Sequence, residues 1–183
     1  MIYILGGASR SGKTQLTRRA VKEKGVPYFP LDALFLGLKK GAPELGVNHD
    51  NTFRERPLKM WPVVKPVVNF FAEEEDDFVI EGDSLLPSQV HELINEGKSI
   101  RACFVGYVEI NKEEKLSLVR KHHQGEKDWT KDIPDEQMIE MIDEMIEFSK
   151  YLKKECGKYD IAYFDISNDF EKTHQEIFKY LFD

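Results

Sequence analysis

The sequence has little cysteine, no long apolar segment and no excess of positive charge. Its two cysteines, Cys103 and Cys156, are far apart in 183 residues, which argues against a disulfide framework and favours a reducing compartment. The apolar run at residues 2–5 is too short for the core of a signal peptide, and no run approaches the length of a membrane span. The net charge of −7 argues against general binding to nucleic acid or anionic membranes. We therefore expect a cytoplasmic protein with neither as a partner.

Short apolar runs alternate with helical patterns along the whole chain. The runs that we expect to form strands are residues 2–5, 26–31, 78–80, 100–108 and 161–166. The segments that we expect to form helices are residues 12–24, 57–72, 88–95, 112–121, 134–157 and 169–182. This alternation is typical of the α/β class, with a parallel sheet covered by helices on both faces. No internal repeat or low-complexity linker interrupts it, so residues 1–183 are predicted to form one domain.

Two segments have no regular pattern. Residues 37–51 contain four glycines or prolines and are predicted to be a loop, which at that length is often functional. Residues 122–131 are predicted to be a polar, basic loop between two helices. In the helix expected at 57–72, Pro62 and Pro66 lack the amide N–H, so we expect them to break or kink it.

A phosphate-binding loop is the most specific motif in the sequence. The residues that fit the pattern G-x-x-x-x-G-K-[ST] are Gly7, Ala8, Ser9, Arg10, Ser11, Gly12, Lys13 and Thr14. The glycines allow a tight turn, and successive N–H groups then form a concave anion site at the start of a helix. Lys13 is expected to reach the β- and γ-phosphates, and the Thr14 hydroxyl to bind Mg²⁺. An apolar strand precedes the motif and a helix follows it, which is the context that this motif requires.

Three carboxylates follow predicted strands. Asp32 is placed at the end of the second strand, and Glu81 and Asp83 at the end of the third. Ligands of open α/β sheets bind beyond the carboxyl ends of the strands. Asp32 is therefore a candidate general base, Glu81 a candidate Mg²⁺ ligand through water, and Asp83 a candidate contact to the acceptor or the metal. The alternative for each is a helix N-cap or an exposed turn carboxylate.

Positive side chains gather in two further places. Arg120, Lys121, His122, His123, Lys127 and Lys131 form a basic cluster between two helices. Such a segment either closes as a lid over a triphosphate, with Arg120 as the best candidate for a catalytic contact, or is a solvated helix end and loop. Arg54 and Arg56 either hold an anionic acceptor or are ordinary surface arginines.

The chain resembles the P-loop small-molecule kinases, a group that includes adenylate, shikimate and gluconate kinases, chloramphenicol phosphotransferase and zeta toxins. The resemblance rests on residues 7–14, on Asp32 after the second strand, and on the third strand at 78–82. It implies a three-layer P-loop NTPase fold with a five-stranded parallel sheet in the order 2-3-1-4-5, an acceptor-binding region at about 33–76 and a lid at about 120–134. It also implies that Asp32 is the catalytic base and that Asn168 and Asp169 contact adenine. The lid departs from the family because Arg120 is its only arginine.

The leading prediction from the sequence is an ATP- and Mg²⁺-dependent kinase of a small molecule. Thr14 and Glu81 are the predicted metal ligands, and Lys13, Asp32 and Arg120 the predicted catalytic residues. A second hypothesis is a nucleotide-dependent switch whose loops at 37–51 and 122–133 become ordered on binding, and a third is a toxin-type kinase of a nucleotide sugar. The predicted partner is a small-molecule acceptor, and the chain is expected to be a monomer or a homodimer.

Overall fold

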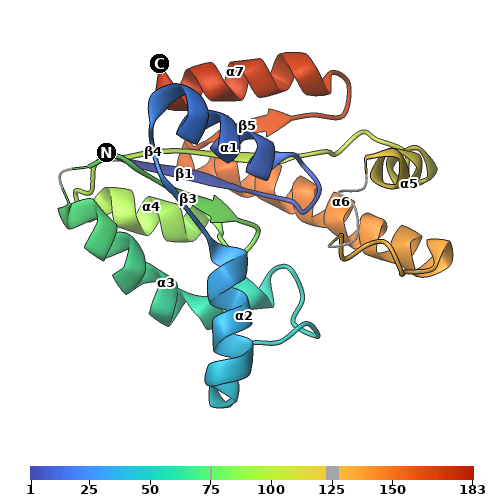
Figure 1. Ribbon diagram of the computed structural model, residues 1–183, viewed down its shortest axis with the longest axis horizontal. Coiled ribbons are helices and arrows are strands. Elements are labelled where there is room, and N and C mark those ends of the chain that lie inside the picture. The colour runs from blue at the N-terminus through green and yellow to red at the C-terminus, as the bar shows by residue number, and fades with distance from the viewer. Residues whose placement is uncertain (75, 123–127) are drawn as a thin grey trace.

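The computed structural model describes residues 1–74, 76–122 and 128–183 (Figure 1). The strands are β1 (Ile2–Gly7), β2 (Tyr28–Pro30), β3 (Phe78–Gly82), β4 (Ile100–Gly106) and β5 (Ala162–Asp165). The helices are α1 (Lys13–Lys24), α2 (Leu31–Gly41), α3 (Glu55–Glu73), α4 (Pro87–Asn95), α5 (Lys112–Lys121), α6 (Asp135–Tyr159) and α7 (Phe170–Phe182), with a 3₁₀ turn η1 (Pro43–Leu45).

The five strands form one parallel sheet in the order β2-β3-β1-β4-β5. In the central strand, Ile4 is opposite Ile80 of β3 on one side and Ala102 of β4 on the other. Every residue of β1 is buried, as expected for a strand with helices on both of its faces. The predicted fold class and strand order are confirmed.

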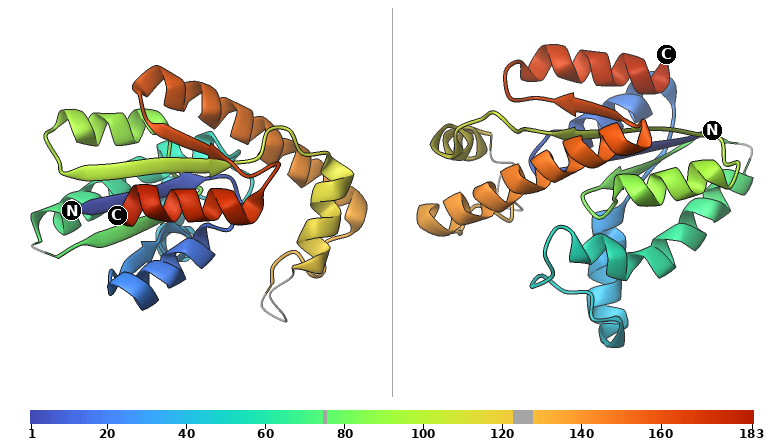
Figure 2. Two further views of the ribbon diagram at one scale, coloured as in Figure 1. Left: turned by 90° about the horizontal axis from the view of Figure 1, so that it is seen from above. Right: turned by 180° about the vertical axis from the view of Figure 1, so that it is seen from behind.

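Helices cover the sheet on both sides. Helices α1 and α7 lie against one face, and α3, α4 and α6 lie against the other (Figure 1). The carboxyl ends of the strands point to the right of Figure 1, where α5 and the N-terminal part of α6 extend beyond the sheet (Figure 2). This edge therefore gathers the segments that follow β1, β3, β4 and β5. None of the described helices is long and apolar enough to cross a membrane.

The segment after β2 differs from its prediction. The strand ends at Pro30, and α2 runs from Leu31 to Gly41. Leu31, the last residue of the predicted strand, and residues 37–41 of the predicted loop are therefore helical. The apolar side chains that mark this helix are Leu31, Leu34, Phe35 and Leu38. Their spacing of three and four residues puts them on one helical face, which packs on the core and outweighs the weak helix propensity of the glycines.

Helix α3 is not broken at its two prolines. It runs from Glu55 to Glu73 with Pro62 and Pro66 inside it, so of the predicted break or kink the break does not occur. The buried residues Met60, Val64 and Val68 form a stripe that holds the helix to the core. Both prolines lie on the exposed side, where water can reach the carbonyl groups that lose an N–H partner.

Candidate functional site

The phosphate-binding loop joins β1 to α1, and its glycines are required by backbone geometry. Gly7 has φ +137°, and a Cβ there would lie 2.0 Å from the carbonyl oxygen of Val105. Gly12 has φ +83°, and a Cβ there would lie 2.3 Å from the ring of His174. Arg10 also has a positive φ of 60°, an uncommon conformation for a non-glycine residue. The loop therefore turns as tightly as the sequence motif predicts.

The carbonyl groups of residues 7–11 all lie within hydrogen-bonding distance of side-chain nitrogen or hydroxyl groups. Lys13 Nζ donates to the carbonyls of Gly7 (3.1 Å) and Ala8 (2.8 Å), Tyr107 Oη donates to Ser9 (2.7 Å), Lys115 Nζ donates to Arg10 (2.9 Å), and His174 Nε2 lies 3.0 Å from the carbonyl of Ser11. The C=O and N–H of one peptide unit point in opposite directions. The N–H groups of residues 9–12 are therefore directed away from these side chains, which is the arrangement that binds a phosphate.

Lys13 and Glu81 lie together beneath this loop. Their exposed fractions are 6% and 7%, so both charges are almost completely withdrawn from water. Burial raises the pKa of Glu81, as do Asp32 and Asp83, whereas Lys13 and a hydrogen bond with Thr14 act in the opposite direction. The structure thus brings together Thr14 and Glu81, the two residues predicted as metal ligands from separate segments of the sequence.

The Thr14 hydroxyl and the Glu81 carboxylate fit a Mg²⁺ ion. Both are hard oxygen donors, and Mg²⁺ in nucleotide sites typically takes one or two protein oxygens and completes its shell with phosphate and water. Among the described residues, no group of three or more His, Cys, Asp or Glu side chains is arranged to hold a metal by itself.

Asp32 lies across the site, on a different element from the one predicted. It is in the first turn of α2, after the N-cap residue Pro30, and is not itself the N-cap. Its side chain is accessible, but reduced hydration raises its pKa, and the charge of Asp83 raises it further. Lys13 and Arg56 lower it. Asp32 is therefore an accessible carboxylate that faces the buried lysine of the phosphate-binding loop.

Asp83 connects the phosphate-binding loop to helix α3. Its carboxylate accepts a 2.6 Å hydrogen bond from Ser9 Oγ and a 3.2 Å hydrogen bond from Ser84 Oγ, and lies 3.6 Å from Nη1 of Arg56. The Arg56 guanidinium also faces the rings of Phe35 and Phe53, at 4.9 and 5.6 Å from their centroids. Arg56 is therefore part of the site, and the interpretation as an ordinary surface arginine is wrong.

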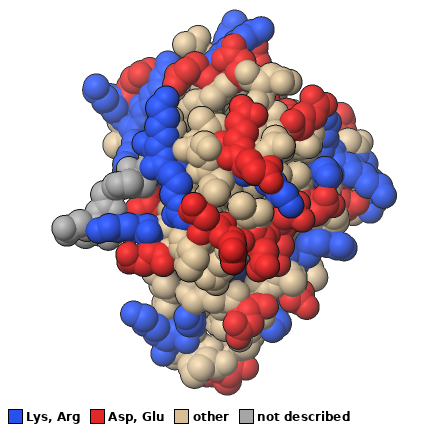
Figure 3. Space-filling model, turned by 90° about the vertical axis from the view of Figure 1, so that its right-hand side faces the viewer, with Lys and Arg blue, Asp and Glu red and all other residues tan. Residues whose placement is uncertain are grey.

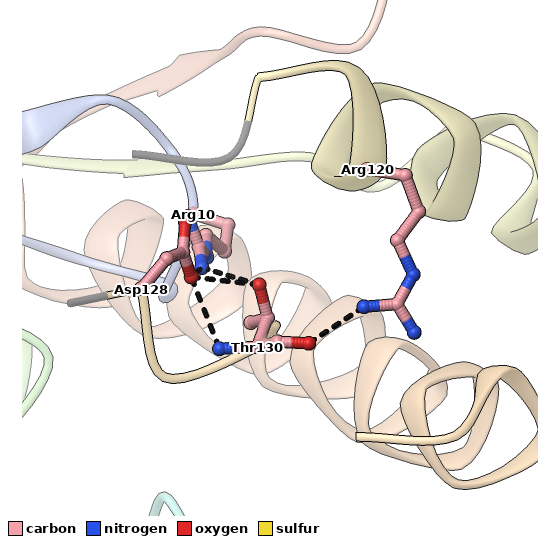
Figure 4. Close-up of polar contacts among 4 residues, drawn as sticks. All are labelled: Arg10, Arg120, Asp128 and Thr130. Atoms are coloured by element: carbon pink, nitrogen blue, oxygen red, sulfur yellow. Dashed lines mark hydrogen bonds and ion pairs between the residues drawn. The ribbon is translucent and has the colours of Figure 1, made fainter. Parts of the chain in front are cut away.

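The segment after α5 contacts the phosphate-binding loop through Arg10 (Figure 4). The Arg10 guanidinium forms an ion pair with Asp128 and donates a 2.7 Å hydrogen bond to Thr130 Oγ1. Asp128 in turn accepts hydrogen bonds from the backbone N–H and the hydroxyl of Thr130. Sequence reasoning missed this contact, because nothing in a polar loop indicates which carboxylate will meet a residue 118 positions away.

Arg120 has a different set of contacts from those of a phosphate-binding arginine. Its guanidinium donates a 2.6 Å hydrogen bond to the carbonyl of Thr130 (Figure 4). It also donates to the carbonyl of Ile133 at 2.6 Å and to Asp135 Oδ1 at 2.7 Å. In this structure Arg120 therefore holds the predicted lid to the start of α6. Of the basic cluster predicted at 120–131, His123 and Lys127 lie outside the described residues.

A cavity of about 510 Å³ opens beside the phosphate-binding loop. It is lined by Arg10, Gly12 and Gln15 on one side, by Tyr107 and Lys115 on another, and by residues 166–171, which include Asn168 and Asp169. Asn168 and Asp169, which are expected to contact adenine, thus line the cavity beside the phosphate-binding loop. Figure 3 views the edge of the sheet where the strands end, and on the residues drawn in colour acidic and basic side chains are interspersed.

The comparisons with known proteins identify the fold. No family model matches the sequence, and no curated protein matches it at a significant level. A shikimate kinase from Bacteroides thetaiotaomicron superposes with a TM-score of 0.60 and 16% identity over 99% of this chain and 98% of that one. A gluconokinase from Sinorhizobium meliloti gives a TM-score of 0.58 and 16% identity over 98% of this chain and 90% of that one. An uncharacterized protein from Eubacterium ventriosum gives 0.53 and 17% over 99% and 97%. The chain therefore has the fold of the P-loop small-molecule kinases.

Proposed function

We propose that the protein is a kinase that transfers the γ-phosphoryl group of ATP, with Mg²⁺, to a hydroxyl or phosphate group of a small molecule. The observation that carries this proposal is the placement of Asp32 and Glu81 around Lys13, at the opening of the phosphate-binding loop. The carbonyls of residues 7–11 in this loop are held by side chains, so they point away from the place where phosphate would bind. A loop of this kind alone binds nucleotide, but an accessible carboxylate on the opposite wall provides for a second substrate.

Each residue has a defined role in this proposal. The N–H groups of residues 9–12 and the Lys13 ammonium would hold the β- and γ-phosphates, and Thr14 and Glu81 would hold Mg²⁺. Bound Mg²⁺ would neutralise charge on the phosphate oxygens. Asp32 accepts the proton of the acceptor hydroxyl, and the hydroxyl oxygen bonds to the γ-phosphorus. The bond from that phosphorus to the β–γ bridging oxygen breaks at the same time, and ADP is released.

The environment of Asp32 suits a general base. Its raised pKa makes it a stronger proton acceptor than an ordinary aspartate. Lys13 and Arg56 act in the opposite direction and favour the ionised form that a base requires. Arg56 and the acceptor-binding region at 33–76 would orient the acceptor, and the lid at 120–134 would exclude water from the transferring group.

The proposal is tested by incubating the protein with Mg²⁺, ATP and a panel of nucleosides, nucleotides, sugars, sugar acids and aminoglycosides, and measuring the mass of the products. An acceptor that gains one phosphate with wild type, but not with Lys13→Ala, supports the kinase. Lys22→Ala is the matched control, because Lys22 is an exposed lysine on the same helix. Tight ATP binding with no acceptor modified, together with protection of residues 37–51 from protease, would favour the nucleotide switch instead.

A further inference from the structure

Lys115 is a buried lysine that the proposed reaction leaves without a role. It lies on the first turns of α5, and only 5% of its surface is exposed. Its Nζ donates a 2.9 Å hydrogen bond to the carbonyl of Arg10 and lies 3.7 Å from the centroid of the Tyr107 ring. The ammonium group is therefore fixed against the outer side of the phosphate-binding loop.

No acidic side chain among residues 1–74, 76–122 and 128–183 forms an ion pair with Lys115. The charges that act on it are those of Arg10 and Lys13, and both are positive. The other titratable groups that line its cavity are Glu114, His122, Asp169 and Glu171. Buried ammonium groups are normally paired, because removal from water strongly disfavours the charged form. Within the described part of the chain, Lys115 is thus a buried cation without an acidic ion-pair partner.

Burial and the two neighbouring cations lower the pKa of Lys115 to about 7. A large share of this lysine is therefore uncharged at neutral and mildly alkaline pH. The neutral amine still has N–H groups to donate to the carbonyl of Arg10, so this hydrogen bond does not require the charge. The positive charge of Lys115 is therefore not needed to hold the Arg10 carbonyl and can act on a bound ligand instead.

The missing anion is accounted for by the cavity that Lys115 shares with the phosphate-binding loop. Lys115 lines it together with Arg10, Gly12 and Gln15, the last of which lies on the first turn of α1. Phosphate groups held by the loop N–H groups would lie across the Arg10 peptide unit from Lys115 and would bring several negative charges close to its ammonium group. An anion there reverses the electrostatic balance around Lys115 and favours its charged form.

We propose that Lys115 is a counter-ion for the phosphates of bound nucleotide and that it takes up a proton from solution when the nucleotide binds. The inference rests on the nucleotide-binding part of the proposed function, but it requires no acceptor. In this account Lys115 is a positioning residue: it fixes the carbonyl of Arg10 in both states, and its charge stabilises the complex.

The test is calorimetry with Mg²⁺ and the non-hydrolysable analogue AMP-PNP at pH 8, in two buffers that differ in ionisation enthalpy. The difference in observed heat gives the number of protons taken up. Wild type is expected to take up close to one proton more than Lys115→Gln or Lys115→Arg. Proton release from Asp32 and Glu81 is common to all of these proteins and cancels in the comparison. Lys112→Gln is the matched control, because Lys112 is an exposed lysine on the same helix.

The variants separate a charge from a merely structural contact. For each protein, the affinity for AMP-PNP is divided by that of Lys115→Gln at the same pH. Lys115→Arg keeps a permanent charge, so its ratio should change little between about pH 7 and 9. The ratio for wild type should fall by up to about tenfold per pH unit. Melting curves establish that each variant is folded. Pyrophosphate should reproduce the proton uptake and adenosine should not.

Equal proton uptake by wild type and Lys115→Gln would overturn the role of Lys115 while leaving the kinase proposal intact. Failure of the wild-type protein to bind AMP-PNP or pyrophosphate at all would overturn both. If Lys115→Gln is unfolded, the comparison of wild type with Lys115→Arg still decides the question.

Discussion

The hydroxyl of Ser9 donates a 2.6 Å hydrogen bond to Asp83, and Asp83 also lies 3.6 Å from the Arg56 guanidinium. The phosphate-binding loop is thereby joined to helix α3 through a single carboxylate at the end of β3. In the proposed kinase this connection lies between the nucleotide and the acceptor. A substitution of Asp83 should therefore affect both the phosphate-binding loop and helix α3.

Removing the Asp83 charge should destabilise the fold. Asp83→Asn leaves the Arg56 guanidinium, which is mostly buried, without its ion-pair partner, and breaking such pairs costs about 3 kcal/mol. Urea unfolding measures this loss, with Asp50→Asn as an exposed control. A double-mutant cycle with Arg56→Met should give a coupling energy of about 1 kcal/mol or more. Additive effects of the two substitutions would contradict the pairing.

Gly7, at the end of β1, and Gly25, after the end of α1, both have a positive φ but should respond very differently to substitution by alanine. Gly7→Ala places a Cβ 2.0 Å from a backbone oxygen, which cannot move away cheaply, so we expect a loss of about 3 kcal/mol or more and loss of nucleotide binding. Gly25→Ala has a similar strained φ of +70° but open space around it, and should cost about 1 kcal/mol. Thermal unfolding compares them directly. Equal costs would show that the close approach to Val105 is unimportant.

Glu81 should lower the free energy of unfolding of the nucleotide-free protein while it supports metal binding. Its pKa is raised in the folded chain, so the folded state binds more protons than the unfolded state between the ordinary and the raised value, and the free energy of unfolding falls as pH rises through that range. Glu81→Gln removes this effect, and the nucleotide-free protein should be more stable than wild type at pH 7. The same variant should lose the dependence of nucleotide binding on Mg²⁺. A variant that is destabilised at pH 7 and still responds to Mg²⁺ would contradict both roles.

Arg10 and Arg120 should have separable effects on the predicted lid. Arg10→Met removes the contact between the phosphate-binding loop and residues Asp128 and Thr130, whereas Arg120→Met removes contacts within the lid and to Asp135. Hydrogen exchange at residues 128–133 should rise in both variants, but nucleotide affinity should fall several-fold only in Arg10→Met. A large loss of transfer rate in Arg120→Met with unchanged exchange would instead support the catalytic role predicted for Arg120.

The sequence predicted the site best where the chemistry is local. The loop at 7–14 is contiguous, so its motif alone places Lys13 and Thr14, and Glu81 follows from the end of an apolar strand. The pairing of Arg10 with Asp128 and of Arg56 with Asp83 depends on tertiary structure, and no local pattern reports it. Lys115 lies in a run of charged residues that suggests an exposed helix. In the structure its spacing of four residues from Val119 puts both side chains on the buried face of α5.

The central claim is that Asp32 and the phosphate-binding loop form one phosphoryl-transfer site. Its most direct test is the single-turnover rate of phosphorylated acceptor formation for wild type, Asp32→Asn and the control Asp50→Asn. The account predicts that Asp32→Asn lowers this rate by about 10²–10⁴-fold, as expected for loss of a general base, while nucleotide affinity stays within a few-fold of wild type. Transfer by Asp32→Asn at the wild-type rate would contradict it.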